Sequence, residues 1–380
     1  MITDHLRPGD TVVVGQTSAE PPTLVDALLD ARTDVTAFVG YTANDAWRRA
    51  RCRVVTYVAG GVLRRVPTVE YLPTHLSRVE EHVVAGRLAA DVVLLRVGPA
   101  DVDGFHDLGP TVDYVWAAAQ RARVVLVEVD EHMPRTRSRR RLHRSLVTEA
   151  FPADRPPITT GSKPPSELDR AVAGRVAALV PDGAAVQLGL GGLADAVAAE
   201  LGSRRGLRMR SGLVGDWLPG LAEAGALDSV VAGMTLGGPD LYAFLDDNPI
   251  AEFAPGSEIT AAVEGPFVAV NSAVEVDLLG QIGAEYVGDR LVGGVGGQVD
   301  FLRAAHGRGV GVVALPSVTT TGATRIVPRL ADPVTTSKSD VDVVVTEHGV
   351  ADLRACTVRE RAERLIAVAH PDHRAGLTRE

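Results

Sequence analysis

Short runs of β-branched and other apolar residues recur along the chain, and several lead through a glycine or a turn into an Ala/Leu-rich stretch. Continuous apolar runs of this kind are typical of strands that are covered on both faces, so they predict a largely parallel sheet. Strands that alternate with helices predict an α/β fold. The first helix is predicted at 23–29, and the predicted strands are 11–14, 91–95, 124–129, 267–270, 311–315 and 341–345.

A stretch rich in proline and glycine, 151–163, interrupts this alternation. Proline fixes φ and removes a backbone donor, so we expect neither helix nor central strand there and interpret the stretch as a linker. A chain of 380 residues has room for two domains, which we place at 1–160 and 166–380. The segment 7–15 weakly resembles 180–189, which favours two related α/β halves.

The composition argues against several classes of function. Hydrophobic residues make up 46% and charged residues 23%, as in an ordinary globular protein, and the net charge of −9 argues against a nucleic-acid binder. No apolar run approaches the roughly 18–20 residues that span a bilayer, and the N-terminus lacks a signal-peptide core, so we expect no membrane partner and a cytoplasmic location. Cys52 and Cys356 fit neither a disulfide framework nor a zinc site. The basic stretch 135–144 is interpreted as a solvated surface loop or helix face, the alternative being a site for an anionic cofactor.

Two glycine clusters could bring backbone N–H groups close to an anion. The first, 293–297, matches neither a phosphate-binding loop ending in Lys-Ser/Thr nor the dinucleotide fingerprint, and it could be a plain turn. The second, 189–192, lies between a predicted strand and a helix, where α/β sheets bind ligands. A tight strand-to-helix connection is the alternative for the second cluster.

Glu275 and Asp277 interrupt an apolar run and are two residues apart, so they share one face of a strand. The pair could form the solvated face of an edge strand. A carboxylate near a glycine loop could also act as a nucleophile, with the loop amides stabilising an oxyanion. Serine hydrolase chemistry has little support, because no Gly-x-Ser-x-Gly motif occurs and His348 and His370 are isolated.

Several ordered blocks together resemble the acetyl-CoA hydrolase/transferase family, which includes acetate and 4-hydroxybutyrate CoA-transferases. The resemblance runs through most of 166–377 and weakly through the first half at 8–10 and 19–21. The matching blocks are 236–249, 271–281, 293–301, 315–317, 325–328, 334–338, 345–354 and 369–371.

The resemblance implies two related open α/β domains with largely parallel sheets and an active site at the domain interface. It assigns the nucleophile to Glu275 and backbone donors to Gly296 and Gly349. It implies no metal and no tightly bound cofactor, with coenzyme A as a substrate, and a homo-oligomer, most simply a homodimer. The positions that it assigns to CoA binding are Gly256, Ser257, Glu258, Ile259, Thr260, Gly294, Gly297 and Gln298.

The expected function is therefore a CoA-transferase that moves CoA between a short-chain acyl-CoA and a small carboxylate through a glutamyl-CoA thioester. An acyl-CoA hydrolase that uses the same glutamate is the alternative, and a non-catalytic acyl-CoA-binding protein is a third hypothesis. The chain departs from the family pattern at 16–18, 193–195, 256–260 and His348. Because of these departures, the resemblance does not identify which acyl group the enzyme transfers.

Overall fold

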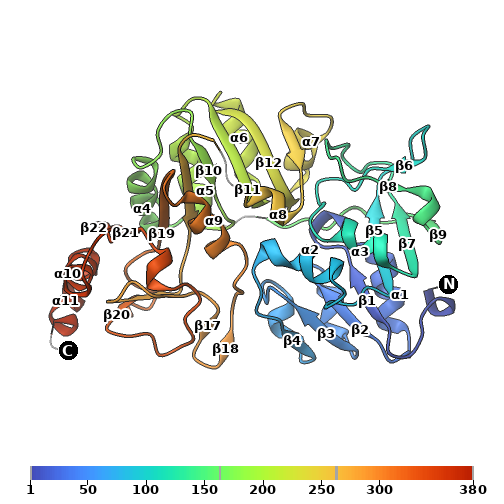
Figure 1. The fold of residues 1–380 in the computed structure, drawn as a ribbon, viewed down its shortest axis with the longest axis horizontal. Helices are drawn as coiled ribbons and strands as arrows, with labels where there is room; N and C mark the ends of the chain where they lie inside the picture. Colours follow the sequence, from blue (N-terminus) through green and yellow to red (C-terminus); the bar gives the residue numbers. More distant parts are fainter. Residues whose placement is uncertain (1, 162–163, 262–263, 379–380) are drawn as a thin grey trace. The chain divides into compact units, whose positions relative to one another are not determined.

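The computed structural model describes residues 2–161, 164–261 and 264–378 (Figure 1). It divides into two compact units, and each unit is discontinuous in sequence. The first unit comprises Met1–Gly161 and Val231–Ile259, and the second comprises Ser162–Val230 and Thr260–Glu380. Both units contain mostly parallel sheets with helical connections, so the predicted α/β class is confirmed.

The first unit is built on a seven-stranded sheet with the order β4-β3-β2-β1-β5-β7-β9, in which every neighbouring pair is parallel. All six residues of the interior strand β5 are buried, and its one charged residue, Arg96, pairs with Asp130 at 2.8 Å. The strands are β1 (Thr11–Val14), β2 (Thr36–Val39), β3 (Arg53–Thr56), β4 (Val69–Tyr71), β5 (Val92–Val97), β7 (Val124–Val129) and β9 (Glu149–Pro152). The helices and the remaining strands of this unit are α1 (Pro22–Asp30), α2 (Leu76–Val84), α3 (Val115–Arg121), β6 (Phe105–His106), β8 (Leu142–His143), α7 (Pro239–Leu245), β13 (Ala251–Phe253) and α8 (Gly256–Ile259).

The second main sheet has the order β13-β12-β11-β10-β14-β19-β21-β22, and β22 closes it as an antiparallel hairpin with β21. A smaller sheet has the order β16-β15-β20. The main strands are β10 (Ala185–Gln187), β11 (Leu207–Val214), β12 (Leu227–Thr235), β14 (Phe267–Asn271), β19 (Gly309–Ala314), β21 (Val343–Thr346) and β22 (Gly349–Asp352). The other elements are β15 (Glu275–Asp277), β16 (Ile282–Gly283), β17 (Tyr286–Val287), β18 (Arg290–Leu291), β20 (Ile326–Val327), α4 (Glu167–Ala177), α5 (Gly192–Leu201), α6 (Trp217–Glu223), α9 (Gln298–Ala305), α10 (Val358–Val368) and α11 (Pro371–Leu377).

The two segments of the predicted internal repeat occupy equivalent places in the two sheets. Each contributes a strand, β1 or β10, that follows a turn with a left-handed glycine, Gly9 at φ +88° or Gly183 at φ +71°. From each strand the next strands extend the sheet to one side, and the chain then returns to pair on the other side, with β5 or β14. Ligands of open α/β sheets bind at the carboxyl ends of the strands where the order reverses in this way.

The predicted linker begins too early. Phe151 and Pro152 complete β9, which pairs with β7 at the edge of the first sheet. An edge strand tolerates proline because it does not need every N–H for the ladder. Within the predicted linker, Ser162 and Lys163 lie outside the described residues.

The basic stretch is a loop from Arg135 to Arg141, as expected, and then enters β8; the loop contacts the returning segment Val231–Ile259 of its own unit. The N–H of Asp247 donates to the Arg135 carbonyl at 2.8 Å, and the Arg135 side chain pairs with Asp247 at 3.2 Å. Nη2 of Arg140 lies 2.8 Å from Oε1 of Glu258, and its guanidinium lies over the Trp116 ring at 4.7 Å. These contacts attach the returning segment to the N-terminal sheet's unit.

Among the residues that the structure describes, no helix has both the length and the apolar character that crossing a membrane requires.

Candidate active site

A pocket of about 260 Å³ opens at the strand-order reversal of the second unit. Its walls come from the connection after β10, residues 188–194, and from the end of β14, residues 270–272. The two strand ends are linked, because Nδ2 of Asn271 donates to Oε1 of the buried Gln187 at 3.0 Å. The predicted glycine cluster 189–192 therefore lines a pocket where α/β sheets bind ligands.

The glycine loop after β10 presents unused backbone donors. Gly191 has φ +108°, a conformation that side-chain-bearing residues rarely adopt, and α5 begins directly after it. Within the described chain, the N–H groups of Gly189, Leu190 and Gly191 donate to no protein acceptor. Together with the positive end of the α5 dipole, these donors suit a negatively charged oxygen.

Glu275 is the first residue of β15, three residues after Ser272 of the pocket wall. Its carboxylate is half-buried and makes no hydrogen bond or ion pair with any described residue. Burial raises the pKa of Glu275 above its usual value, the charge of Asp332 adds to that shift, and Arg325 opposes it. β15 is the middle strand of its small sheet, so the alternative of an edge strand with a solvated acidic face is wrong.

Arg325 holds the backbone that leads into Glu275, a role that our sequence analysis did not assign. Its Nε donates to the Val274 carbonyl at 2.9 Å, and its Nη2 donates to the Ala273 carbonyl. Burial lowers the pKa of Arg325, and nearby carboxylates, Glu275 among them, oppose the shift. Arg325 therefore places a positive charge behind the strand that carries the candidate nucleophile.

Asp277, in contrast, has a structural role. It is fully buried and accepts hydrogen bonds from the N–H groups of Leu279 at 3.0 Å and Gln281 at 2.9 Å. The Gln281 side-chain amide donates to the second carboxylate oxygen at 2.8 Å. Asp277 thus closes the turn after β15 with hydrogen bonds to both of its carboxylate oxygens.

The first glycine cluster of the sequence analysis, 293–297, leads directly into α9. It starts beside Glu285, whose carbonyl accepts the N–H of Gly293 at 3.1 Å, and it includes Gly296 at φ +52°. Gly297 caps α9, and Nε2 of Gln298 donates to the Ser272 carbonyl at 3.4 Å. This cluster and the pocket wall are therefore in contact through Gln298.

The remaining predicted site residues are spread over both units. Gly349 begins β22 in the second unit with φ +156°, next to a turn where Glu347 accepts hydrogen bonds from the Ser317 N–H at 2.8 Å and the Ser317 hydroxyl at 2.6 Å. Gly256–Ile259 forms α8 in the first unit, where the Ser257 hydroxyl donates to Glu80 at 2.9 Å. Thr260 belongs to the second unit.

In the described part of the chain, no group of three His, Cys, Asp or Glu side chains is arranged to hold a metal ion.

Comparison with known proteins identifies the family from both halves of the chain. Residues 3–140 match the acetyl-CoA hydrolase/transferase N-terminal domain, and residues 237–380 match the C-terminal domain of that family. The chain is 32% identical to a 4-hydroxybutyrate coenzyme A transferase of Clostridium kluyveri, and the match covers 100% of the chain and 94% of that protein.

Solved structures agree with these sequence matches. RipA from Yersinia pestis superposes with a TM-score of 0.90 at 26% identity, covering 99% of this chain and 94% of that one. A 4-hydroxybutyrate CoA-transferase from Porphyromonas gingivalis superposes with a TM-score of 0.84 at 31% identity over the same shares of the two chains. The chain belongs to the acetyl-CoA hydrolase/transferase family of enzymes.

Proposed function

We propose that the protein is a CoA-transferase that exchanges CoA between a short-chain acyl-CoA and a small carboxylate, with Glu275 as the nucleophile. The main observation in support is that the Glu275 carboxylate is half-buried and has no hydrogen-bond or ion-pair partner among the described residues. Glu275 follows Ser272 by three residues, and Ser272 lines a pocket whose glycine loop offers unused N–H donors. Family membership supports the choice, as do relatives named 4-hydroxybutyrate CoA-transferases.

The proposed reaction proceeds by four acyl transfers. The Glu275 carboxylate attacks the thioester carbonyl, the C–S bond breaks, and CoA leaves as a thiolate from an acyl-glutamyl anhydride. The thiolate then attacks the glutamyl carbonyl, which releases the first carboxylate and leaves a glutamyl-CoA thioester. The acceptor carboxylate repeats both steps in reverse, so no net oxidation or proton transfer is required.

Each transfer passes through a tetrahedral oxyanion that needs hydrogen-bond donors. We assign these to the N–H groups of the loop at Leu190, of Gly296 and of Gly349, each in the second unit. Removing one such donor typically costs about 3 kcal/mol of transition-state stabilisation. We also propose that Gly256–Thr260, Gly294, Gly297 and Gln298 contact CoA, which serves as substrate, and that the enzyme is a cytoplasmic homodimer.

The test is to trap the proposed intermediate. Wild-type protein incubated with acyl-CoA and no acceptor should gain the mass of CoA, and peptide mapping should place the adduct between Asn271 and Gln281. Glu275→Gln should abolish both the adduct and turnover with little loss of stability, because it removes a half-buried charge without changing the shape. Glu275→Asp should lose about 10²-fold in rate, since the carboxylate retreats by about 1 Å.

The matched control is Glu223→Gln, which changes an exposed glutamate at the end of α6. It should keep wild-type activity and adduct formation. An adduct that persists in Glu275→Gln, or that maps to another peptide, would refute Glu275 as the nucleophile.

The second candidate function is acyl-CoA hydrolysis, which is favoured by the solvent-exposed part of the Glu275 side chain, since water can reach a thioester formed there. Free-thiol release and CoA exchange onto added carboxylates separate the two activities. Rapid thiol release without exchange onto any carboxylate would exclude the transferase. Binding of CoA without turnover across a broad acyl-CoA panel would favour a non-catalytic binding protein.

A further inference from the structure

We propose that Trp217 is a positioning residue that locks the peptide between Gly189 and Leu190, so that the Leu190 N–H is turned into the pocket. The inference rests on the proposed function, because it gives this N–H a substrate oxygen to bind. Trp217 is the first residue of α6, and its side chain is largely buried.

Nε1 of Trp217 donates to the Gly189 carbonyl at 3.3 Å. In a planar trans peptide the carbonyl of one residue and the N–H of the next point in opposite directions. Holding the Gly189 carbonyl towards Trp217 therefore turns the Leu190 N–H to the other side of the loop, and this N–H has no acceptor among the described residues.

Two further contacts restrict the same peptide. The Ser211 hydroxyl lies 2.5 Å from the Leu188 carbonyl and so holds the preceding peptide. The Leu190 side chain packs on Gly215, where an added Cβ would lie 2.5 Å from Cδ2 of Leu190 and 3.5 Å from Nε1 of Trp217. The glycine at 215 thus leaves room for both the end of the Leu190 side chain and the indole.

The hydrogen bond from Trp217 is needed because the peptide between Gly189 and Leu190 could otherwise rotate. Gly189, Gly191 and Gly192 give the loop the conformational freedom of glycine. If the peptide flipped, the Gly189 carbonyl oxygen would face the pocket and repel an oxyanion. The indole N–H selects the orientation that donates, while Trp217 itself is not part of the pocket wall.

The test compares two tryptophan-to-phenylalanine substitutions. Trp217→Phe keeps an aromatic ring but removes the N–H. Trp116→Phe is the matched control, since Nε1 of Trp116 also donates to a backbone carbonyl, that of Arg141 at 3.2 Å, in the first unit. We expect kcat to fall at least tenfold in Trp217→Phe with KM for acyl-CoA changed less than twofold, and Trp116→Phe to stay within twofold of wild type in both.

A second variant perturbs the loop without touching the indole. Gly215 does not have a left-handed φ, so Gly215→Ala adds no backbone strain and acts through its contact with Leu190. Gly215→Ala should show the same loss in kcat. It therefore provides the test if Trp217→Phe does not fold.

The outcomes separate the inference from the proposed function. Wild-type kcat in a folded Trp217→Phe, or a raised KM with unchanged kcat, overturns the role of Trp217. If Trp217→Phe does not fold, wild-type kcat in Gly215→Ala overturns it. A wild-type enzyme that neither transfers nor hydrolyses any acyl-CoA refutes the proposed function itself, and the inference falls with it.

Discussion

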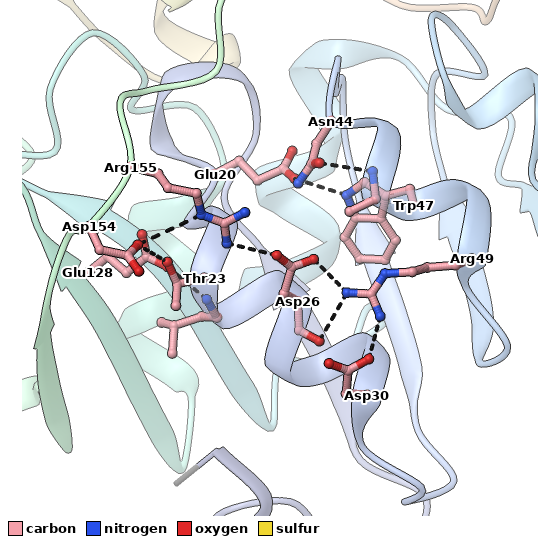
Figure 2. Close-up of polar contacts among 12 residues, drawn as sticks. Glu20, Thr23, Asp26, Asp30, Asn44, Trp47, Arg49, Glu128, Asp154 and Arg155 are labelled. Carbon is pink, nitrogen blue, oxygen red and sulfur yellow. Dashed lines mark hydrogen bonds and ion pairs between the residues drawn. The ribbon is translucent and has the colours of Figure 1, made fainter.

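Glu20 shows how a single buried carboxyl group can set the pH response of the first unit (Figure 2). The side chain is fully buried, and one oxygen accepts from Nδ2 of Asn44 at 2.8 Å and from Nε1 of Trp47 at 3.0 Å. Its other oxygen has no partner among the described residues. Burial raises the pKa of Glu20 from 4.5 to about 7, against hydrogen bonds that lower it, and Glu128 adds a small repulsion.

The raised pKa makes a stability prediction with a definite sign. Below pH 4.5 Glu20 is protonated in both the folded and the unfolded protein, so no charge is buried. As the pH rises through about 7, folding requires a buried carboxylate, and about 3 kcal/mol of stability is lost. Glu20→Gln cannot ionise, so its free energy of unfolding should exceed that of wild type by a margin that grows from pH 5 to pH 8.

Urea unfolding at both pH values measures that margin. Glu131→Gln, at an exposed position of the same unit, serves as the control and should give no growing margin. An equal difference between Glu20→Gln and wild type at pH 5 and pH 8 would contradict the prediction.

At the scale of elements, α8 is held by charged contacts from the basic stretch. Arg140 pairs with Glu258 at 2.8 Å, within the segment proposed to contact CoA. Arg140→Gln removes the charge, and a partly exposed pair of this kind is worth up to about 1 kcal/mol. We therefore expect KM for acyl-CoA to rise about two- to fivefold with kcat unchanged.

Arg139→Gln is the neighbouring control, because Arg139 is exposed and makes no hydrogen bond or ion pair with the described residues. Added salt should raise the wild-type KM towards that of Arg140→Gln, since screening weakens the same pair. A KM that is equal in both variants at low salt would argue against this role of α8.

The elements that the sequence predicts well are those with continuous apolar runs. The predicted 124–129 is β7 residue for residue, and β5, β14, β19 and β21 lie within three residues of their predicted bounds. Strands such as β11 escaped prediction because buried and partly exposed positions alternate along its first half, with Arg208 and Arg210 on the partly exposed side. Short strands such as β4 carry too few residues for a pattern.

Only those features of the site that form local patterns in the sequence could be predicted. The two glycine clusters and Glu275 stand out in the sequence, and their roles in the reaction remain predictions. Trp217 and Arg325 were missed because their contacts join residues 28 and 51 positions apart. No spacing rule connects an indole with a distant carbonyl until the chain is folded.

At the scale of the whole molecule, the first unit is incomplete without the returning segment Val231–Ile259. That segment supplies Glu258 to Arg140, Ser257 to Glu80, and a bridge between Met234 and Thr111. A fragment of residues 1–161 should therefore unfold at a lower temperature than the first unit within the intact chain. A peptide of residues 231–259 added in trans should raise its melting temperature, whereas a scrambled peptide should not. A fragment as stable alone as with the peptide would contradict this expectation.

The same discontinuity has a consequence during synthesis. Residue 259 leaves the ribosome about a hundred residues after Gly161, a delay on the order of 5–20 s at bacterial and eukaryotic elongation rates. During that interval the N-terminal sheet has been made, but the arginines and apolar positions that receive the returning segment are uncovered. The exposure of this surface to aggregation is thus set by the rate of elongation between residues 162 and 259, as well as by the stability of the finished fold.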